Sequence, residues 1–126
     1  MKSENSTQTA MGNLNVKSYT FAIRIVKLSQ HLQNTKKEYV MSKQILRSGT
    51  AIGALIRESE FGQSKPDFIS KLSIGLKEAN ETEYWLSLLK DTAFLEEKLY
   101  ISLKHDCLEL IKMLVASINT AKANLK

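Results

Sequence analysis

The sequence predicts an all-α protein, an antiparallel up-and-down four-helix bundle. Four stretches repeat their apolar residues at intervals of three and four, which is the spacing of one helix face. The β-branched residues never form the alternating runs that a half-buried strand needs. The 126 residues include one proline and five glycines, so little interrupts long helices. Four amphipathic helices joined by short polar connections are typical of a bundle.

The first half of the chain divides into a tail and two helices. Residues 1–16 are rich in Ser, Thr, Asn and Gln and have no helical period, which predicts a disordered tail. Residues 17–126 are expected to form the bundle. The first helix is predicted from about Ser18 to Gln33, and the second from Glu38 or Ser42 to Gly62. Their predicted core stripes are Phe21, Ile25, Leu28 and Leu32, and then Met41, Ile45, Ile52, Leu55 and Ile56.

The third helix has the clearest start. Ser64 is a suitable N-cap, Pro66 lies in the first turn, and Asp67 follows the cap by three residues. Asp91 and Thr92 are expected at its end. Its predicted core stripe is Ile69, Leu72, Leu76, Ala79 and Leu86.

The fourth helix is predicted from about Glu97 to Ala123. A 3-4 repeat of apolar residues predicts the stripe that packs against the other helices. Its members are Ile101, Leu108, Ile111, Val115, Ile118 and Leu125, with Leu114 and Ala121 beside them.

Small residues mark places where helices approach closely. Gly49 and Gly53 lie one turn apart inside the second helix, where each costs about 1 kcal/mol relative to alanine. Gly75 and Ala79 have the same spacing in the third helix. We therefore expect the second and third helices to meet with small residues facing small residues. Contact between two subunits is the alternative.

The composition argues against several kinds of site: disulfides, zinc and di-iron centres, and membrane spans. The single cysteine, Cys107, excludes an intramolecular disulfide and a cysteine-based zinc site, and it favours the reducing cytoplasm. No apolar run approaches the roughly 20 residues of a membrane span. Neither His31 nor His105 has a glutamate three residues before it, so the di-iron pattern of helical bundles is missing. We expect no metal and no cofactor.

The net charge of +5 is concentrated in the first half of the chain. Residues 1–65 contain ten Lys and Arg against four Asp and Glu, and residues 66–126 contain eight against nine. A basic surface of this kind can contact phosphates. The alternative is a solvated face, or ion pairs with the third helix or a neighbouring subunit. The candidate residues are Lys36, Lys37, Lys43, Arg47 and Arg57.

Charged residues on the third helix offer partners for these cations. Glu78 and Glu81 are expected to pair with Arg47 or Arg57, between helices or between subunits. Paired carboxylates for acid–base catalysis are the other interpretation, but no histidine lies near them in the sequence. Trp85 borders the apolar stripe and is expected to pack. The sequence therefore predicts a non-enzymatic protein.

The chain also resembles a known bacterial family, the four-helix-bundle proteins encoded in intervening sequences of 23S rRNA genes (S23-type ribosomal-like proteins). The resemblance covers about residues 18–115, and this chain departs from it at Leu55 and Phe61, where smaller or more polar residues are usual. The matching strings include Leu46-Arg47-Ser48-Gly49-Thr50, Ile52-Gly53-Ala54, Ile56-Arg57-Glu58, Gln63-Ser64-Lys65 and Leu76-Lys77-Glu78-Ala79-Asn80-Glu81-Thr82.

The resemblance carries expectations about assembly and binding. The family is related in fold to the accessory protein of diversity-generating retroelements, a basic pentamer that binds a reverse transcriptase and nucleic acid. This implies a homopentamer here, and binding of RNA, DNA or a nucleic-acid-processing protein through a basic surface. The alternative is a structural or protein-interaction oligomer that binds no nucleic acid.

Overall fold

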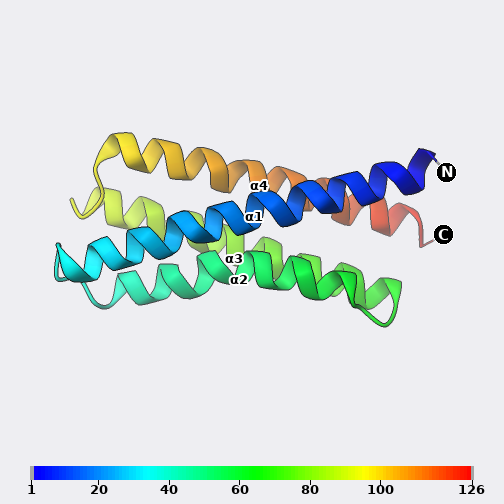
Figure 1. The fold of residues 1–126 in the computed structure, drawn as a ribbon, viewed down its shortest axis with the longest axis horizontal. Coiled ribbons are helices and arrows are strands. Elements are labelled where there is room, and N and C mark those ends of the chain that lie inside the picture. The colour runs from blue at the N-terminus through cyan, green and yellow to red at the C-terminus, as the bar shows by residue number, and fades with distance from the viewer. Residues whose placement is uncertain (1, 126) are drawn as a thin grey trace.

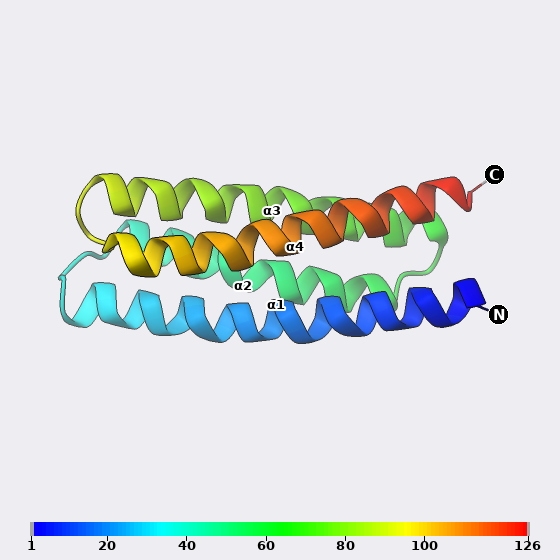
Figure 2. The same cartoon turned by 90° about the horizontal axis from the view of Figure 1, so that it is seen from above.

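Four helices make up the structure, a computed structural model that describes the backbone of residues 2–125 and the side chains of residues 9–125. They are α1 (Lys2–Asn34), α2 (Met41–Glu60), α3 (Lys65–Asp91) and α4 (Glu97–Ala123). The helices run antiparallel in sequence order (Figure 1). The α1–α2 and α3–α4 turns lie at one end of the bundle, and the α2–α3 turn lies with both termini at the other (Figure 2). The predicted up-and-down helical bundle is confirmed for this part of the chain.

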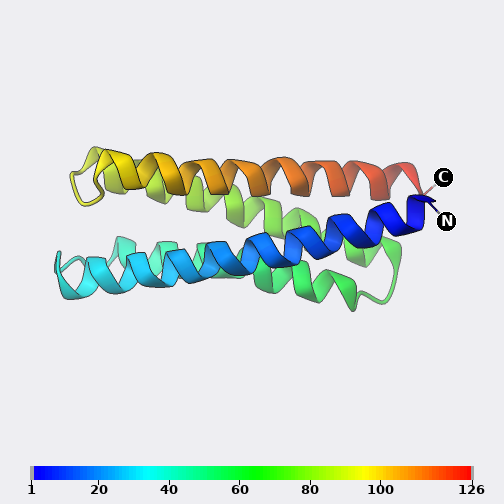
Figure 3. The ribbon, with the colours of Figure 1, turned by 45° about the horizontal axis from the view of Figure 1, so that its top comes forward.

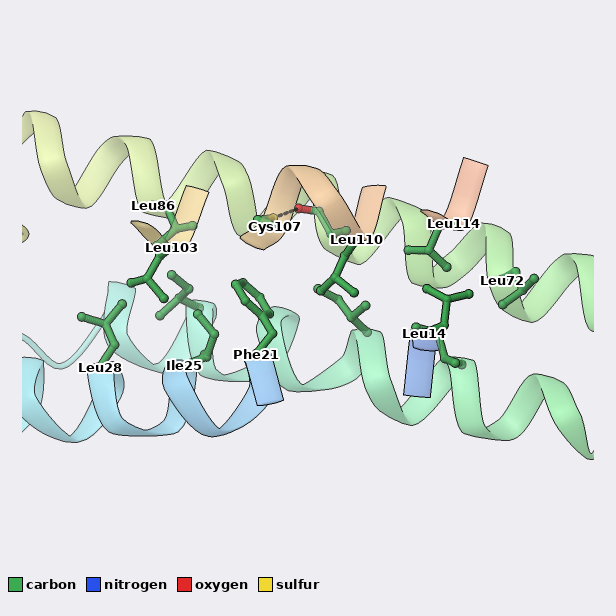
Figure 4. Close-up of a cluster of buried hydrophobic side chains, with 14 of the residues drawn as sticks. Leu14, Phe21, Ile25, Leu28, Leu72, Leu86, Leu103, Cys107, Leu110 and Leu114 are labelled. Atoms are coloured by element: carbon green, nitrogen blue, oxygen red, sulfur yellow. Dashed lines mark hydrogen bonds between the residues drawn. The ribbon is translucent and has the colours of Figure 1, made fainter. Parts of the chain in front are cut away.

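Each helix packs against two neighbours, in the pairs α1–α2, α2–α3, α3–α4 and α1–α4. These pairs close a circuit of four helices, which all run along the same long direction (Figure 3). Apolar side chains from all four helices form the core, as the close-up shows for residues from Leu28 at one side to Leu72 at the other (Figure 4). The stripe predicted for the first helix is confirmed, since Phe21, Ile25 and Leu32 are each 1% exposed or less.

The first helix is much longer than predicted. The sequence predicts a disordered tail over 1–16 and a start near Ser18, whereas α1 begins at Lys2. Met11 and Leu14 are buried and extend the 3-4 spacing of the core stripe toward the N-terminus. The polar residues around Met11 and Leu14 have modest helix propensity. Packing of a few apolar residues against a bundle is nevertheless enough to stabilise a helix. Met1 lies outside the described residues.

The start of α2 depends on a side chain outside the helix. Val40 occupies the N-cap position and provides no side-chain hydrogen bond. The carboxylate of Glu38 accepts hydrogen bonds from the backbone N–H groups of Met41 and Ser42 at 3.1 and 2.7 Å. The hydroxyl of Ser42 donates back to the carbonyl of Glu38 at 2.8 Å. Glu38 therefore satisfies the unpaired donors of the first turn, and the helix begins at Met41.

The predicted start of α3 is confirmed. The hydroxyl of Ser64 accepts a hydrogen bond from the N–H of Asp67 at 3.1 Å. The carboxylate of Asp67 in turn accepts from the N–H of Gln63 at 3.2 Å. Pro66 lies in the first turn, where its missing N–H has no consequence. This reciprocal pair of bonds closes the α2–α3 turn and fixes where α3 begins.

The limits predicted for α4 are confirmed, but the stripe predicted to face the core is only partly right: Ile118 is buried and Ile111 packs against the core, whereas the other four members are exposed. Ile101, Leu108 and Val115 are 59%, 42% and 40% exposed, and Leu125 is exposed as well. Because α4 carries two apolar stripes, its periodicity alone does not tell which one faces inward. The buried residues of α4 are Leu103, Cys107, Leu110, Leu114, Ile118 and Ala121.

The two glycines of α2 face α1, not α3 as predicted. A Cβ added at Gly49 would stand 2.8 Å from Cγ2 of Ile25, and one at Gly53 would stand 3.2 Å from the hydroxyl oxygen of Ser18. Gly75 does face α2, with the Cβ of Leu55 at 3.7 Å from its added Cβ. The expected contact of small residues with small residues between α2 and α3 is therefore wrong, because the glycines of these two helices have different neighbours.

Candidate functional site

A cluster of charged side chains joins α2 to α3. Nη1 of Arg47 lies 3.0 Å from Oε1 of Glu78, and its Nη2 binds Glu81. The indole N–H of Trp85 donates to the same carboxylate of Glu81 at 3.0 Å. The structure therefore contains the expected pairing of Arg47 with both glutamates, and it forms within one chain. Arg57, the alternative partner, forms no ion pair among the described residues.

The hydrogen bonds of this cluster favour its charged forms. The bond from Trp85 lowers the pKa of Glu81 most, burial opposes this effect, and the bond from Arg47 lowers the pKa further. Hydrogen bonds to Glu81 and Glu78 raise the pKa of Arg47. These shifts keep Arg47 and Glu81 charged at neutral pH, and the guanidinium is paired with the carboxylates of both Glu78 and Glu81. It is poorly available to a phosphate.

Beneath this cluster, a buried polar contact connects the same two helices. The hydroxyl oxygens of Ser48 and Thr82 lie 2.9 Å apart, and both residues are fully buried. Ala79, one turn before Thr82, is also buried, and its carbonyl accepts a hydrogen bond from the thiol of Cys107 on α4. Buried groups that are all hydrogen-bonded specify the relative position of the helices. These residues hold the bundle together and do not reach the surface.

The remaining cations predicted to bind nucleic acid do not form one patch. Lys36 and Lys37 lie in the α1–α2 turn, and Lys43 lies in the first turn of α2. All three are exposed. Arg57 follows Lys43 by four helical turns, about 20 Å along α2, and so lies near the opposite end of the helix. Of the five predicted cations, Lys36, Lys37 and Lys43 therefore lie together at one end of the bundle, apart from Arg47 and Arg57.

Two exposed apolar stripes are a feature that the sequence reasoning missed. On α1, Val16, Tyr19, Ile23 and Val26 are between 36% and 67% exposed. On α4, the residues predicted to be core, Ile101, Leu108 and Val115, form the other stripe. The 3-4-3 spacing of the α1 stripe is visible in the sequence. The same helix has a second apolar row, Phe21, Ile25, Leu28 and Leu32, and only that row was predicted as a structural feature. We call these sets the α1 stripe and the α4 stripe.

The described residues offer little for catalysis or metal binding. No three His, Cys, Asp or Glu side chains between residues 9 and 125 are placed to hold one metal ion. Burial raises the pKa of the Cys107 thiol to about 12, with the charges of Glu83 and Asp106 adding to the effect. A thiol of this kind is not a nucleophile at neutral pH. No helix in the described part of the chain is both long and apolar enough to cross a membrane.

Comparison with known proteins assigns the chain to a family. The model of the 23S rRNA-intervening sequence proteins matches residues 13–116, which include both stripes and the Arg47 cluster. The chain belongs to this family. The family predicted from the sequence strings is therefore confirmed.

A solved member of the same group has nearly the same fold as this 23S rRNA-intervening sequence protein. It is the crystal structure of a protein of unknown function from the S23 ribosomal protein family of Bacteroides thetaiotaomicron. The two chains are 54% identical with a TM-score of 0.86, over 87% of this chain and 98% of the other. A search of functionally curated proteins gave no match. The comparisons thus establish the family and the fold.

Proposed function

We propose that this 23S rRNA-intervening sequence protein is a non-catalytic assembly protein of the cytoplasm that works as a homo-oligomer, with the pentamer as the expected form. The observation that carries the proposal is the pair of exposed apolar stripes on α1 and α4. Apolar residues exposed singly are normal on a monomer, whereas contiguous apolar patches mark interaction sites. Seven such residues in two rows at helical spacing favour association with another helical surface.

The polar groups of the chain support a non-catalytic role. The two carboxylates that were candidates for acid–base work, Glu78 and Glu81, are bound by Arg47. The thiol of Cys107 is buried among the core residues. The strongest polar interactions of the described residues thus connect helices to one another, as expected of a scaffold.

Binding of RNA, DNA or a nucleic-acid-processing protein is a second proposal, favoured by one observation. Lys36, Lys37 and Lys43 are exposed at one end of the bundle, and none of them forms an ion pair among the described residues. In a ring of copies, these ends would lie side by side and the small basic patch would repeat. Oligomerisation would therefore strengthen a phosphate contact that is weak in one chain.

One experiment on the purified full chain tests both proposals. Light scattering gives the mass in solution, and fluorescence anisotropy in the same buffers gives binding to an RNA hairpin and a DNA duplex as salt is titrated. A mass near five times the 14.2 kDa of the chain is expected. A monomer at micromolar concentration would contradict the assembly proposal.

The measurement of nucleic-acid binding has its own control. Binding through the basic end should weaken steeply with salt, and the double variant Lys36→Glu, Lys37→Glu should lose it. The variant Lys65→Glu, Lys122→Glu makes the same charge change at the opposite end of the bundle and should retain most binding. If an intact oligomer binds neither RNA nor DNA at low salt, the nucleic-acid proposal is wrong. The protein is then a scaffold that contacts only other proteins.

A further inference from the structure

The two exposed stripes have the spacing of helix-packing surfaces. Val16, Tyr19, Ile23 and Val26 follow one another at intervals of three, four and three residues, which is the a/d pattern of a coiled coil. Ile101, Leu108 and Val115 are separated by seven residues, so they also lie on one line of a helix. Each stripe therefore follows one line along the bundle, suited to a second helix that runs beside it. The line is apolar throughout on α1, whereas on α4 Lys104 stands between Ile101 and Leu108.

The α1 stripe lies on the side of α1 that faces away from the core. Lys17 and Arg24 reach across to α4, while Ser18 and Ile25 contact the glycines of α2. Successive residues turn by about 100° around a helix. With Lys17 taken as the origin, the core residues Phe21 and Ile25 lie at about 40° and 80° around α1, whereas the α1 stripe lies at about 180–260°, on the far side of the helix from the core. This stripe therefore faces outward, with Val26 and Tyr19 nearer α2 and Ile23 and Val16 nearer α4.

The α4 stripe lies on the side of α4 next to α3. Asp106 and Glu109 reach α1, while Cys107 and Lys104 contact Ala79 and Glu83 of α3. With the same turn of about 100° per residue, the positions just beyond the α3 contact are those of the α4 stripe. This stripe therefore faces outward on the broad face formed by α3 and α4. The two stripes lie on opposite faces of one bundle.

Contacts within the chain show that both stripes lie at the same level along the bundle. Arg24 binds Asp106 at 2.6 Å and Ser102 at 2.9 Å, and Lys17 binds Glu109 at 2.8 Å. The part of α1 that carries its stripe is thus level with the part of α4 that carries the other. A rotation about an axis parallel to the helices therefore brings the α1 stripe of one copy against the α4 stripe of the next without a shift along the axis.

We propose that the α1 stripe of one copy packs antiparallel against the α4 stripe of a second copy, so that the chain assembles head to tail into a closed ring. This inference rests on the proposed assembly function and names its two surfaces. A head-to-tail contact with no shift along the axis closes into a ring, whereas one with a shift produces a filament. In this arrangement Val26 meets Ile101, and Tyr19 meets Leu108.

Charge complementarity at one end of the contact supports a second copy as the occupant. Lys27 directly follows Val26, and Glu97 precedes Ile101 by one helical turn. Both are exposed, and neither forms an ion pair among the described residues. The antiparallel register that brings Val26 to Ile101 also places this cation beside this carboxylate. A symmetric contact between two α1 stripes would instead leave Glu97 without this partner and the α4 stripe uncovered.

Complementation between two variants tests the head-to-tail contact. Ile23→Glu disrupts only the α1 stripe, and Leu108→Glu disrupts only the α4 stripe. Each variant alone should be a monomer, because a head-to-tail contact needs both surfaces. An equimolar mixture should form a heterodimer and nothing larger, since only one intact stripe of each kind remains. Native mass spectrometry of the separate and mixed full chains measures this. Far-UV circular dichroism confirms that each variant is folded.

A matched control and the contrary outcomes make the test decisive. Ile74 on α3 is 42% exposed, as are Ile23 and Leu108, but it lies outside both stripes, so Ile74→Glu should assemble like the unaltered chain. If Leu108→Glu alone still forms dimers, or if the mixture stays monomeric, the head-to-tail contact is overturned while the assembly function stands. If the unaltered chain is itself a monomer, both proposals are overturned.

An engineered disulfide gives a second readout that does not require disrupted variants. Val26→Cys and Ile101→Cys, placed in one chain, lie on opposite faces of a protomer, so any bond between them joins two copies. Mild oxidation should produce a ladder of covalent oligomers on a non-reducing gel. Each single variant should give no more than dimers. A double variant that gives no ladder while its oligomer remains intact would show that the stripes do not meet.

Discussion

Arg47 shows how far single residues depend on their neighbours for a role. In the sequence it is one of five cations that favour a polyanion surface. In the structure its guanidinium binds Glu78 and Glu81 on the next helix, and Glu81 also accepts the indole N–H of Trp85. A planar guanidinium between two carboxylates makes geometrically specific bonds, which a lysine would not reproduce. Charge counting therefore overstates the basic surface, because it does not include the pairing.

Glycines of the same chain are predicted to respond in opposite ways to alanine. At Gly49 an added Cβ would stand 2.8 Å from a methyl group of the fully buried Ile25. Overpacking costs about 1–3 kcal/mol, which exceeds the gain of about 1 kcal/mol in helix propensity. Gly49→Ala should therefore lower the free energy of unfolding. At Gly12 nothing lies within 4 Å of the added Cβ, so Gly12→Ala should raise it by up to about 1 kcal/mol.

Urea unfolding of the two variants and the unaltered chain measures both effects. Gly12 also reports on α1 itself, because a substitution in a disordered tail would leave the stability unchanged. A stabilised Gly49→Ala variant would show that α1 and α2 are not in close contact at Ile25.

At the scale of the element, local signals were predictable and tertiary choices were not. The start of α3 could be read from Ser64, Pro66 and Asp67, because a cap is a contact among neighbours in sequence. The first half of α1 could not be predicted from the sequence, because Met11 and Leu14 stabilise the helix only by packing on the other helices. The inward face of α4 could not be chosen either, because two apolar stripes on one helix have similar spacing.

The assignment of the two faces of α4 leads to a contrast between Leu110 and Leu108. Leu110 is 1% exposed in the core and Leu108 is 42% exposed. Truncation of a buried leucine to alanine costs about 2–5 kcal/mol, whereas exposed positions change stability by about 0.5 kcal/mol or less. We therefore expect Leu110→Ala to be strongly destabilising and Leu108→Ala to be nearly neutral. Both are best made in the Ile23→Glu background, so that assembly does not contribute to the unfolding transition. Equal losses in urea unfolding would refute the assignment.

At the scale of the whole molecule, carboxylates with lowered pKa values join two of the four helix pairs and cap the start of α2. Burial raises the pKa of Glu38, but the three backbone N–H groups at the start of α2 outweigh it and lower the pKa below 4.5. Hydrogen bonds from Trp85 and Arg47 lower that of Glu81 between α2 and α3. A hydrogen bond from Lys17 lowers that of Glu109 between α4 and α1. The charged forms of these groups therefore support the start of one helix and the contacts of two helix pairs.

Acid should consequently weaken the bundle as a whole. A group whose pKa is lower in the folded state stabilises the fold fully above its unfolded pKa, and that contribution disappears as the pH falls through the folded pKa. The free energy of unfolding should thus be constant just above pH 4.5, the ordinary value for these carboxyls, and decline below it. Glu38→Gln should lose about 1 kcal/mol at neutral pH, as for removal of a helix cap.

Urea unfolding at a series of pH values between 7 and about 3 measures the decline. Because a neutral amide does not titrate in this range, Glu38→Gln should also show a shallower decline than the unaltered chain, and the two curves should converge at the acid end. Glu58→Gln is a suitable control, since that carboxylate is exposed, lies 3.8 Å from the ammonium group of Lys71 and does not cap a helix. Parallel curves for Glu38→Gln and the unaltered chain would mean that the α1–α2 junction does not depend on the charge of Glu38.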